Sequence, residues 1–262
     1  MPFTENAGAK IYWEEHGSGE PLLLIMGLGS CLEMWHRTLP VVTPHYRTII
    51  FDNRGVGKSD IPPGPYPIPT MASDVVAVMD AAGIEKAHVY GISMGGIIAQ
   101  ELALSYPERV RSLILGCTTH GGPQSIPAAP EVISVLMKRG EMTVEQAIEA
   151  MTPFVYDAGT SRQELEIDID LRRKYPASPE GYYGQLQGIL AYESRSRLSQ
   201  ITSPTLVIHG ETDQLIPAEN GRMIAGLVPG AKLVLLPNAS HIFMTDQPKA
   251  TQDAVLGFLQ AH

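Results

Sequence analysis

The sequence predicts an α/β fold whose central sheet is mostly parallel and is covered by helices on both faces. Three observations support this prediction. Apolar, strand-like runs alternate with runs of helical pattern along much of the chain, as in sheets built from β-α-β units. The strand-like runs lack a polar face, as expected of strands buried on both sides. One strand–helix junction also carries a Gly-x-Ser-x-Gly turn, Gly91–Gly95.

The expected elements follow in chain order. Residues 3–16, interrupted near Asn6-Ala7-Gly8, predict a hairpin. Buried strands are expected over residues 21–26, 47–52, 87–92, 110–117, 205–209 and 232–236. Helical patterns lie between most of them, including one over residues 70–82 that starts behind Pro69 and ends at Gly83.

The alternation stops between about residues 122 and 197. Helical character is expected over 131–139, 143–151, 161–174 and 179–192, with proline or glycine breaks between these runs. We therefore expect a first core part over 1–122, a helical cap over 123–197 and a second core part over 198–262. The cap aromatics either line a substrate pocket or pack the cap onto the core; they are Phe154, Tyr156, Tyr175, Tyr182, Tyr183 and Tyr192.

The Gly-x-Ser-x-Gly turn identifies Ser93 as a candidate nucleophile. An apolar strand precedes the turn and a helical run follows it, which is the context in which this motif exposes a serine hydroxyl. Gly91 and Gly95 leave room for a sharp turn because neither carries a Cβ atom. The hydroxyl is expected at the carboxyl edge of the sheet, near the positive end of the following helix.

Candidate partners for Ser93 follow two later strands. Asp213 comes shortly after the strand at 205–209, and His241 follows the strand at 232–236. The chain order serine, acid, histidine fits the motif, with His241 as the base and Asp213 orienting its imidazole. Glu211 is the rival for the acid, and His209 is expected to pack within its strand.

Acyl transfer also needs donors for the negative charge that develops on the carbonyl oxygen. One donor is expected to be the backbone N–H of Met94, directly after the nucleophile. The other is assigned to the backbone N–H of Leu28, in the loop after the strand at 21–26, where Gly27 lets the chain turn close to the site. Predicted substrate contacts are Gly27, Leu215, Ile216 and Ile242.

The chain resembles the α/β-hydrolase superfamily over nearly its whole length. Besides the serine, acid and histidine, residues 51–59 are similar to the Asp-x-Arg-Gly-x-Gly-x-Ser loop of this family, and residues 106–115 to its nucleophile-helix exit and sixth strand. The pair Leu28-Gly29, together with Leu32-Glu33-Met34-Trp35, resembles the carboxylesterase and 3-oxoadipate enol-lactonase branch. Many relatives carry His-Gly where this chain has Met26-Gly27. The resemblance implies an α/β-hydrolase fold with a helical cap inserted after strand six.

The expected function is a carboxylesterase that cleaves small to medium esters through an acyl-enzyme intermediate, without cofactor or metal. The first alternative is an enol-lactonase or other lactonase. Its carboxylated substrate would need a buried cation, for which the cap offers Arg162, Arg172, Arg173, Arg195 and Arg197. Less favoured alternatives are a perhydrolase or non-haem haloperoxidase-like activity, and a non-catalytic receptor.

Composition limits the partners. The net charge of −9 disfavours nucleic acid or an anionic membrane as partner, so a small-molecule ester or lactone is expected. No segment predicts a membrane span or a secretory leader, which favours a cytoplasmic protein. Two cysteines, Cys31 and Cys117, make no disulfide framework and are expected to be small buried residues.

Overall fold

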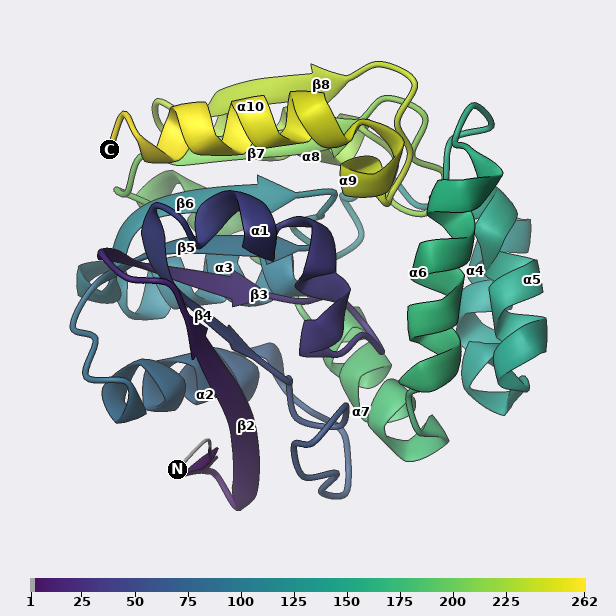
Figure 1. The fold of residues 1–262 in the computed structure, drawn as a ribbon, viewed down its shortest axis with the longest axis horizontal. Coiled ribbons are helices and arrows are strands. Elements are labelled where there is room, and N and C mark those ends of the chain that lie inside the picture. The colour runs from purple at the N-terminus through teal and green to yellow at the C-terminus, as the bar shows by residue number, and fades with distance from the viewer. Residues whose placement is uncertain (1–2) are drawn as a thin grey trace.

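The computed structural model describes residues 3–262, and its described part contains an eight-stranded sheet in the order β1-β2-β4-β3-β5-β6-β7-β8 (Figure 1). The hairpin strands β1 and β2 are antiparallel to each other, and β2 is antiparallel to β4. The strands from β4 across to β8 are mutually parallel. The strands are β1 (Phe3–Asn6), β2 (Ala9–His16), β3 (Glu20–Ile25), β4 (Tyr46–Phe51), β5 (Ala87–Ile92), β6 (Val110–Gly116), β7 (Thr205–Gly210) and β8 (Lys232–Leu236).

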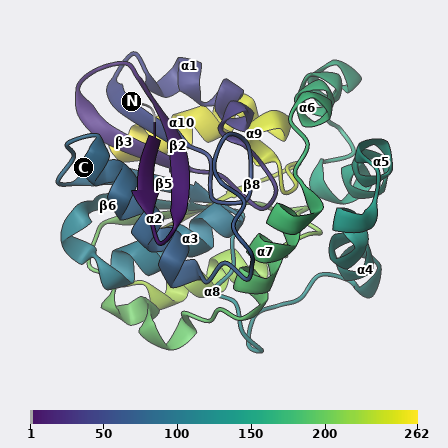
Figure 2. The ribbon, with the colours of Figure 1, turned by 90° about the horizontal axis from the view of Figure 1, so that it is seen from below.

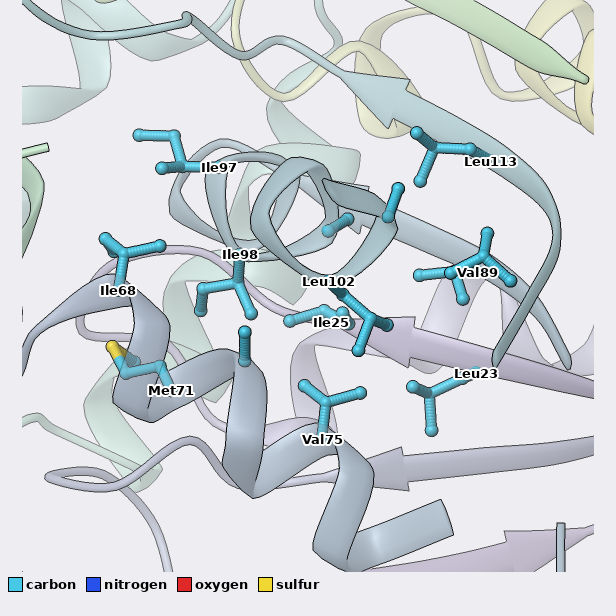
Figure 3. Packing of buried hydrophobic residues seen from close by; sticks show 14 of the residues in the cluster. Leu23, Ile25, Ile68, Met71, Val75, Val89, Ile97, Ile98, Leu102 and Leu113 are labelled. Carbon is cyan, nitrogen blue, oxygen red and sulfur yellow. The ribbon is translucent and has the colours of Figure 1, made fainter. Parts of the chain in front are cut away.

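Helices cover both faces of the sheet because neighbouring strand residues point to opposite sides. Leu23 and Ile25 of β3 pack into one core cluster with α2 (Ile68–Ala81), α3 (Met94–Ser105) and α8 (Glu219–Leu227). Figure 3 shows part of this cluster, in which Leu23 and Ile25 face side chains of α2 and α3.

Leu22 and Leu24 point to the opposite face and pack into a second cluster. That face is covered by η1 (Leu32–Arg37), α1 (Leu39–Val42), α9 (Phe243–Asp246) and α10 (Pro248–Leu259). A strand such as β3 is therefore apolar at consecutive positions, since each side of it meets a different core.

The helical segment between β6 and β7, residues 117–204, is called the insertion below. Its helices are α4 (Pro130–Lys138), η3 (Arg139–Glu141), α5 (Val144–Val155), α6 (Arg162–Lys174), α7 (Pro179–Leu190) and η4 (Arg195–Gln200). In Figure 1, α4, α5 and α6 stand beyond the carboxyl ends of the strands, on the side to which the arrows of β3, β6 and β8 point. Both views place α7 between these three helices and the core (Figure 2).

The fold class predicted from the sequence is confirmed, and each expected strand lies within one or two residues of the observed one. The hairpin is also confirmed, with Ala7 and Gly8 at positive φ in its two-residue turn. The start predicted behind Pro69 is wrong, because α2 begins at Ile68. Proline is tolerated in the first turn, where its missing N–H has no helical partner. The domain boundaries at 122/123 and 197/198 stay a prediction.

Candidate active site

Ser93 lies at the apex of the turn between β5 and α3, in a strained backbone conformation. Its φ of 54° and ψ of −122° lie in a region that a residue with a Cβ atom rarely adopts. The flanking structure holds it there. The Ser93 N–H donates to the Gly116 carbonyl at 2.9 Å, and the Ser93 carbonyl accepts from the Thr118 hydroxyl at 2.7 Å. The side chain is therefore fixed at the carboxyl end of the sheet.

The two glycines of the motif stand where the backbone passes too close for a side chain. A Cβ atom on Gly95 would lie 2.0 Å from the Ile25 carbonyl oxygen, and one on Gly91 would lie 2.2 Å from the Gly95 carbonyl oxygen. Both distances are far below a normal van der Waals contact, so α3 can start against β3 and β5 only if these positions are glycine. This is the room for the turn that the sequence predicts.

His241 and Asp213 form a buried hydrogen-bonded pair. His241 Nδ1 lies 2.8 Å from Asp213 Oδ2, and both residues are only 5% exposed. Asp213 Oδ1 accepts the backbone N–H groups of Leu215 and Ile216, each at 2.9 Å. Burial raises the pKa of Asp213, but the charge of His241 and the hydrogen bonds from His209 and His241 outweigh it and hold the pKa at about 2. The carboxylate is thus ionised at neutral pH.

Ser93 and His241 open onto the same cavity. Among residues 3–262 the Ser93 hydroxyl makes no hydrogen bond to His241. Hydrogen bonds of this kind are often long until a substrate is bound. Glu211, the other candidate acid, has an exposed side chain. Of the two candidate acids, it is therefore Asp213 that is hydrogen-bonded to His241.

The backbone N–H groups of Leu28 and Met94 are both available to an acceptor, since neither donates a hydrogen bond within residues 3–262. Met94 is the first residue of α3, where an N–H has no helical partner. The loop that carries Leu28 is held against Ser93: a Cβ atom on Gly27 would lie 3.1 Å from the Ser93 Cβ atom. Both amides also belong to residues that line the cavity.

The cavity has a volume of about 670 Å³ and lies between the carboxyl edge of the sheet and the insertion. Its wall contains all four residues predicted as substrate contacts, which are Gly27, Leu215, Ile216 and Ile242. Leu, Ile, Met and Val side chains, from both the core and the insertion, form the largest group in the remaining wall. Such a cavity suits a small organic substrate with an apolar part.

The insertion aromatics divide between the two roles considered for them. Tyr156, Tyr175 and Tyr182 line the cavity, whereas Phe154, Tyr183 and Tyr192 are not part of its wall. Of the five arginines offered by the sequence as a buried cation, only Arg172 lines the cavity. Arg162 is almost fully exposed, and Arg173 binds Glu145 and Asp170 at the surface.

Two residues in contact with this site were not anticipated from the sequence. His209, expected only to pack in its strand, has its Nε2 atom 2.8 Å from the Ile216 carbonyl oxygen and 3.2 Å from Asp213 Oδ2. The i, i+4 spacing of His209 and Asp213 across the strand end was the available signal.

Gln185 of α7 is the second missed residue. Its side chain is fully buried, accepts the Gly29 N–H at 2.8 Å and donates to the Arg54 carbonyl at 2.8 Å. It thus ties the loop that carries Leu28 to the insertion. No local sequence pattern marks this contact, which spans 156 residues.

Cys31 and Cys117 are free and buried, as predicted, and burial raises the pKa of both thiols. Residues 3–262 contain no group of three or more His, Cys, Asp or Glu side chains placed to hold a metal ion. Within the same range, none of the helices combines the length and apolar character that crossing a membrane requires.

Comparison with known proteins places this geometry in a family. The family model described as alpha/beta hydrolase fold matches residues 20–150 and 166–248. The putative carbamate hydrolase RutD of Azorhizobium caulinodans is 30% identical, over 98% of each chain. The poly(3-hydroxyalkanoate) depolymerase of Ectopseudomonas oleovorans is 32% identical, over 92% of this chain and 84% of that protein.

A solved structure shows the same likeness along the whole chain. The enol-lactonase of Burkholderia xenovorans LB400 superposes with a TM-score of 0.88 at 28% identity, covering 99% of this chain and 100% of that one. The resemblance to the enol-lactonase-like branch is thereby confirmed. With a family match over most of its length and relatives that align from end to end, this chain belongs to the alpha/beta hydrolase family.

Proposed function

We propose that the protein is a serine hydrolase that cleaves small to medium carboxylic esters through an acyl-enzyme intermediate. One observation carries the proposal above the others. The strained Ser93 at the start of α3 opens onto the same cavity as the hydrogen-bonded pair His241–Asp213. A nucleophile, a base and an orienting acid around one substrate-sized cavity are the parts that acyl transfer requires.

In the first half-reaction the Ser93 oxygen attacks the ester carbonyl carbon while its proton passes to His241 Nε2. The carbonyl oxygen gains the negative charge, which the N–H groups of Leu28 and Met94 stabilise; one such donor contributes roughly 2.7–4 kcal/mol. The bond to the alcohol oxygen then breaks, and His241 returns its proton to that oxygen. Asp213 keeps Nδ1 of the imidazole as a donor and stabilises the imidazolium.

In the second half-reaction water replaces the alcohol. His241 takes a proton from the water as its oxygen attacks the acyl carbon, and the same two N–H groups hold the second oxyanion. The bond to Ser93 breaks, the serine recovers its proton from His241, and the carboxylic acid leaves. The substrate, one water molecule and the named residues of the chain balance both steps.

A lactone is the second candidate substrate, supported by the likeness to the enol-lactonase of B. xenovorans. In a lactone the leaving oxygen stays tethered to the acyl group, so the same residues perform the same proton transfers. The cavity, at about 670 Å³, has room for an acyl group and its tethered alcohol in one site.

The test is hydrolysis of p-nitrophenyl esters of increasing acyl length by the wild type and by Ser93→Ala. We expect turnover of short esters and a fall in kcat of several powers of ten in the variant, on the order of 10⁴ or more. A fluorophosphonate should label the wild type and not the variant. The matched control is Ser125→Ala, which removes another serine from the cavity wall and should keep both activity and labelling.

The outcomes separate the possibilities. If simple esters are inert but Ser93 is labelled, the nucleophile is competent and lactones are the next substrates to assay. If Ser93→Ala retains wild-type turnover, or if neither turnover nor labelling occurs, the proposed mechanism is wrong.

A further inference from the structure

The ionisable side chains in the wall of the cavity are unbalanced. Among residues 3–262, three arginines line it, Arg37, Arg139 and Arg172, against a single carboxylate, Asp168, with neither lysine nor glutamate. The whole chain, by contrast, has a net charge of −9. The excess of positive charge inside the cavity of this acidic protein is therefore a local feature. Its role depends on which of the three arginines is paired with a carboxylate.

Arg37 and Asp168 neutralise each other. Arg37 of η1 donates to Asp168 Oδ1 of α6 from both Nε, at 3.1 Å, and Nη2, at 3.0 Å, and it also binds Glu164. Asp168 Oδ2 accepts the hydroxyls of Thr245 at 2.6 Å and Tyr156 at 3.2 Å. The carboxylate is only 1% exposed. Both side chains are thus engaged in joining the insertion to the core.

Arg139 and Arg172 have no such partner. Within residues 3–262 neither guanidinium forms an ion pair with a carboxylate, although both side chains are half-buried in the cavity wall. Arg139 lies over the ring of Tyr182, with its Cζ atom 5.2 Å from the ring centroid. Burial and then the positive charge of Arg172 lower the pKa of Arg139, whereas Tyr182 raises it.

Two guanidinium groups that line one cavity without carboxylate partners favour an anion in that cavity. Unpaired charges in a low-dielectric space are unfavourable, and an anion would satisfy both. Arginine presents a planar fork of donors that matches the two oxygens of a carboxylate. Hydrogen bonds of this charged type are roughly twice as strong as neutral ones.

We propose that Arg139 and Arg172 form a subsite for a carboxylate carried by the substrate, so that the ester or lactone cleaved at Ser93 is anionic. This inference rests on the proposed function, because it concerns the substrate of the same cavity. The apolar wall accommodates the carbon chain between the scissile carbonyl and the carboxylate. The two arginines then select against neutral esters of the same length.

The experiment compares kcat/KM for pairs of substrates that differ only in the carboxylate. One pair carries it on the acyl side, mono-p-nitrophenyl adipate against p-nitrophenyl hexanoate. The other pair carries it on the leaving group, 4-carboxyphenyl hexanoate against phenyl hexanoate. We expect the wild type to prefer the carboxylated member of one pair by about 10- to 100-fold, as charged hydrogen bonds allow, and the pair that shows it identifies which side of the substrate is anionic.

The variants Arg139→Gln and Arg172→Gln test the assignment. Each should reduce the preference by about tenfold or more, and because the preference is a ratio within one variant, losses of folded protein cancel. Arg162→Gln is the control, since Arg162 lies on α6 like Arg172 but has a side chain that is 92% exposed. It should keep the wild-type ratio.

The outcomes for this inference and for the proposed function are distinct. Ser93-dependent turnover of neutral esters with a ratio near one in both pairs would leave the hydrolase standing and overturn the anionic subsite. A preference that survives in both Arg139→Gln and Arg172→Gln would overturn the assignment to these residues. Absence of all turnover and of fluorophosphonate labelling overturns both proposals.

Discussion

At the scale of single residues, the environment of Asp213 explains why a carboxylate can remain charged in a buried place. Its two oxygens accept three hydrogen bonds, from His241 and from the N–H groups of Leu215 and Ile216, and His209 Nε2 lies 3.2 Å from Oδ2. A carboxylate that accepts several hydrogen bonds and faces a cation keeps a low pKa despite desolvation. The same contacts fix its orientation, so Oδ2 is presented to His241 and not to solvent.

Replacement of Asp213 by asparagine tests this arrangement. The amide has a similar shape but offers a donor where His241 Nδ1 needs an acceptor, so the imidazole loses the tautomer that accepts a proton from Ser93. We expect kcat on a short p-nitrophenyl ester to fall by about 10⁴-fold, the size of effect seen when an acid in this role is replaced by its amide. Far-ultraviolet circular dichroism should show a folded variant.

Glu211→Gln is the matched control, because Glu211 follows the same strand but is exposed. Its kcat should stay within about twofold of the wild type, as for surface changes away from the site. If the two variants exchange these behaviours, the acid is Glu211 and the assignment of Asp213 fails.

At the scale of elements, the parallel strands were predictable because they are mostly apolar, and β5, β7 and β8 are each followed by a motif residue. The run at 87–92 was expected as a strand and is β5 at the same bounds. The relative positions of distant segments were not predictable. The contacts of Arg37 with Asp168 and of Gln185 with Gly29 join residues more than 100 positions apart, and no local pattern encodes such pairings. The same reason hid Arg139 of η3, which lines the same cavity as Arg172 of α6 only once the insertion has folded.

The start of α3 gives the element-scale prediction. In Gly95→Ala the new Cβ atom would lie 2.0 Å from the Ile25 carbonyl oxygen, so α3 must move away from β3. We expect the free energy of unfolding in urea to fall by about 1–3 kcal/mol, as overpacking does, together with a loss of esterase activity because Ser93 is displaced.

Gly226→Ala is the contrasting substitution in another helix. Gly226 is exposed in α8 and a Cβ atom there meets nothing within 4 Å. Alanine should raise the free energy of unfolding by about 0.4–1 kcal/mol, because it restricts the unfolded chain and favours the helix. If Gly95→Ala proves as harmless as Gly226→Ala, then the close approach of α3 to β3 does not limit this position.

At the scale of the whole molecule, the cavity exists because the insertion is tied to the core at separate points around it. Arg37 of η1 holds α6 through Asp168, and Gln185 of α7 holds the loops at Gly29 and Arg54. The backbone N–H of Ile242, beside His241, donates to the Val155 carbonyl at the end of α5 at 2.8 Å. The cavity wall and the residues around Ser93 and His241 are therefore held together by the same contacts. Unfolding of the chain disrupts both of them.

The buried charge of Asp213, within this connected site, predicts how the free energy of unfolding depends on pH. Asp213 has a folded-state pKa of about 2, against an unfolded value of 3.8. The unfolded chain therefore binds this proton first as the pH falls, so the contribution of Asp213 is fully present above about pH 4 and is lost between there and pH 2. The difference corresponds to about 2 kcal/mol.

Urea unfolding of the wild type at pH 5, 4, 3 and 2.5 should show this loss, superimposed on the titration of other carboxylates. The Asp213→Asn protein lacks the titrating group, so the stability difference between the two proteins should change in favour of the variant by up to about 2 kcal/mol as the pH falls through this window. A difference that stays constant from pH 5 to 2.5 would mean that Asp213 has the same pKa in both states and that its hydrogen-bond donors do not hold its charge.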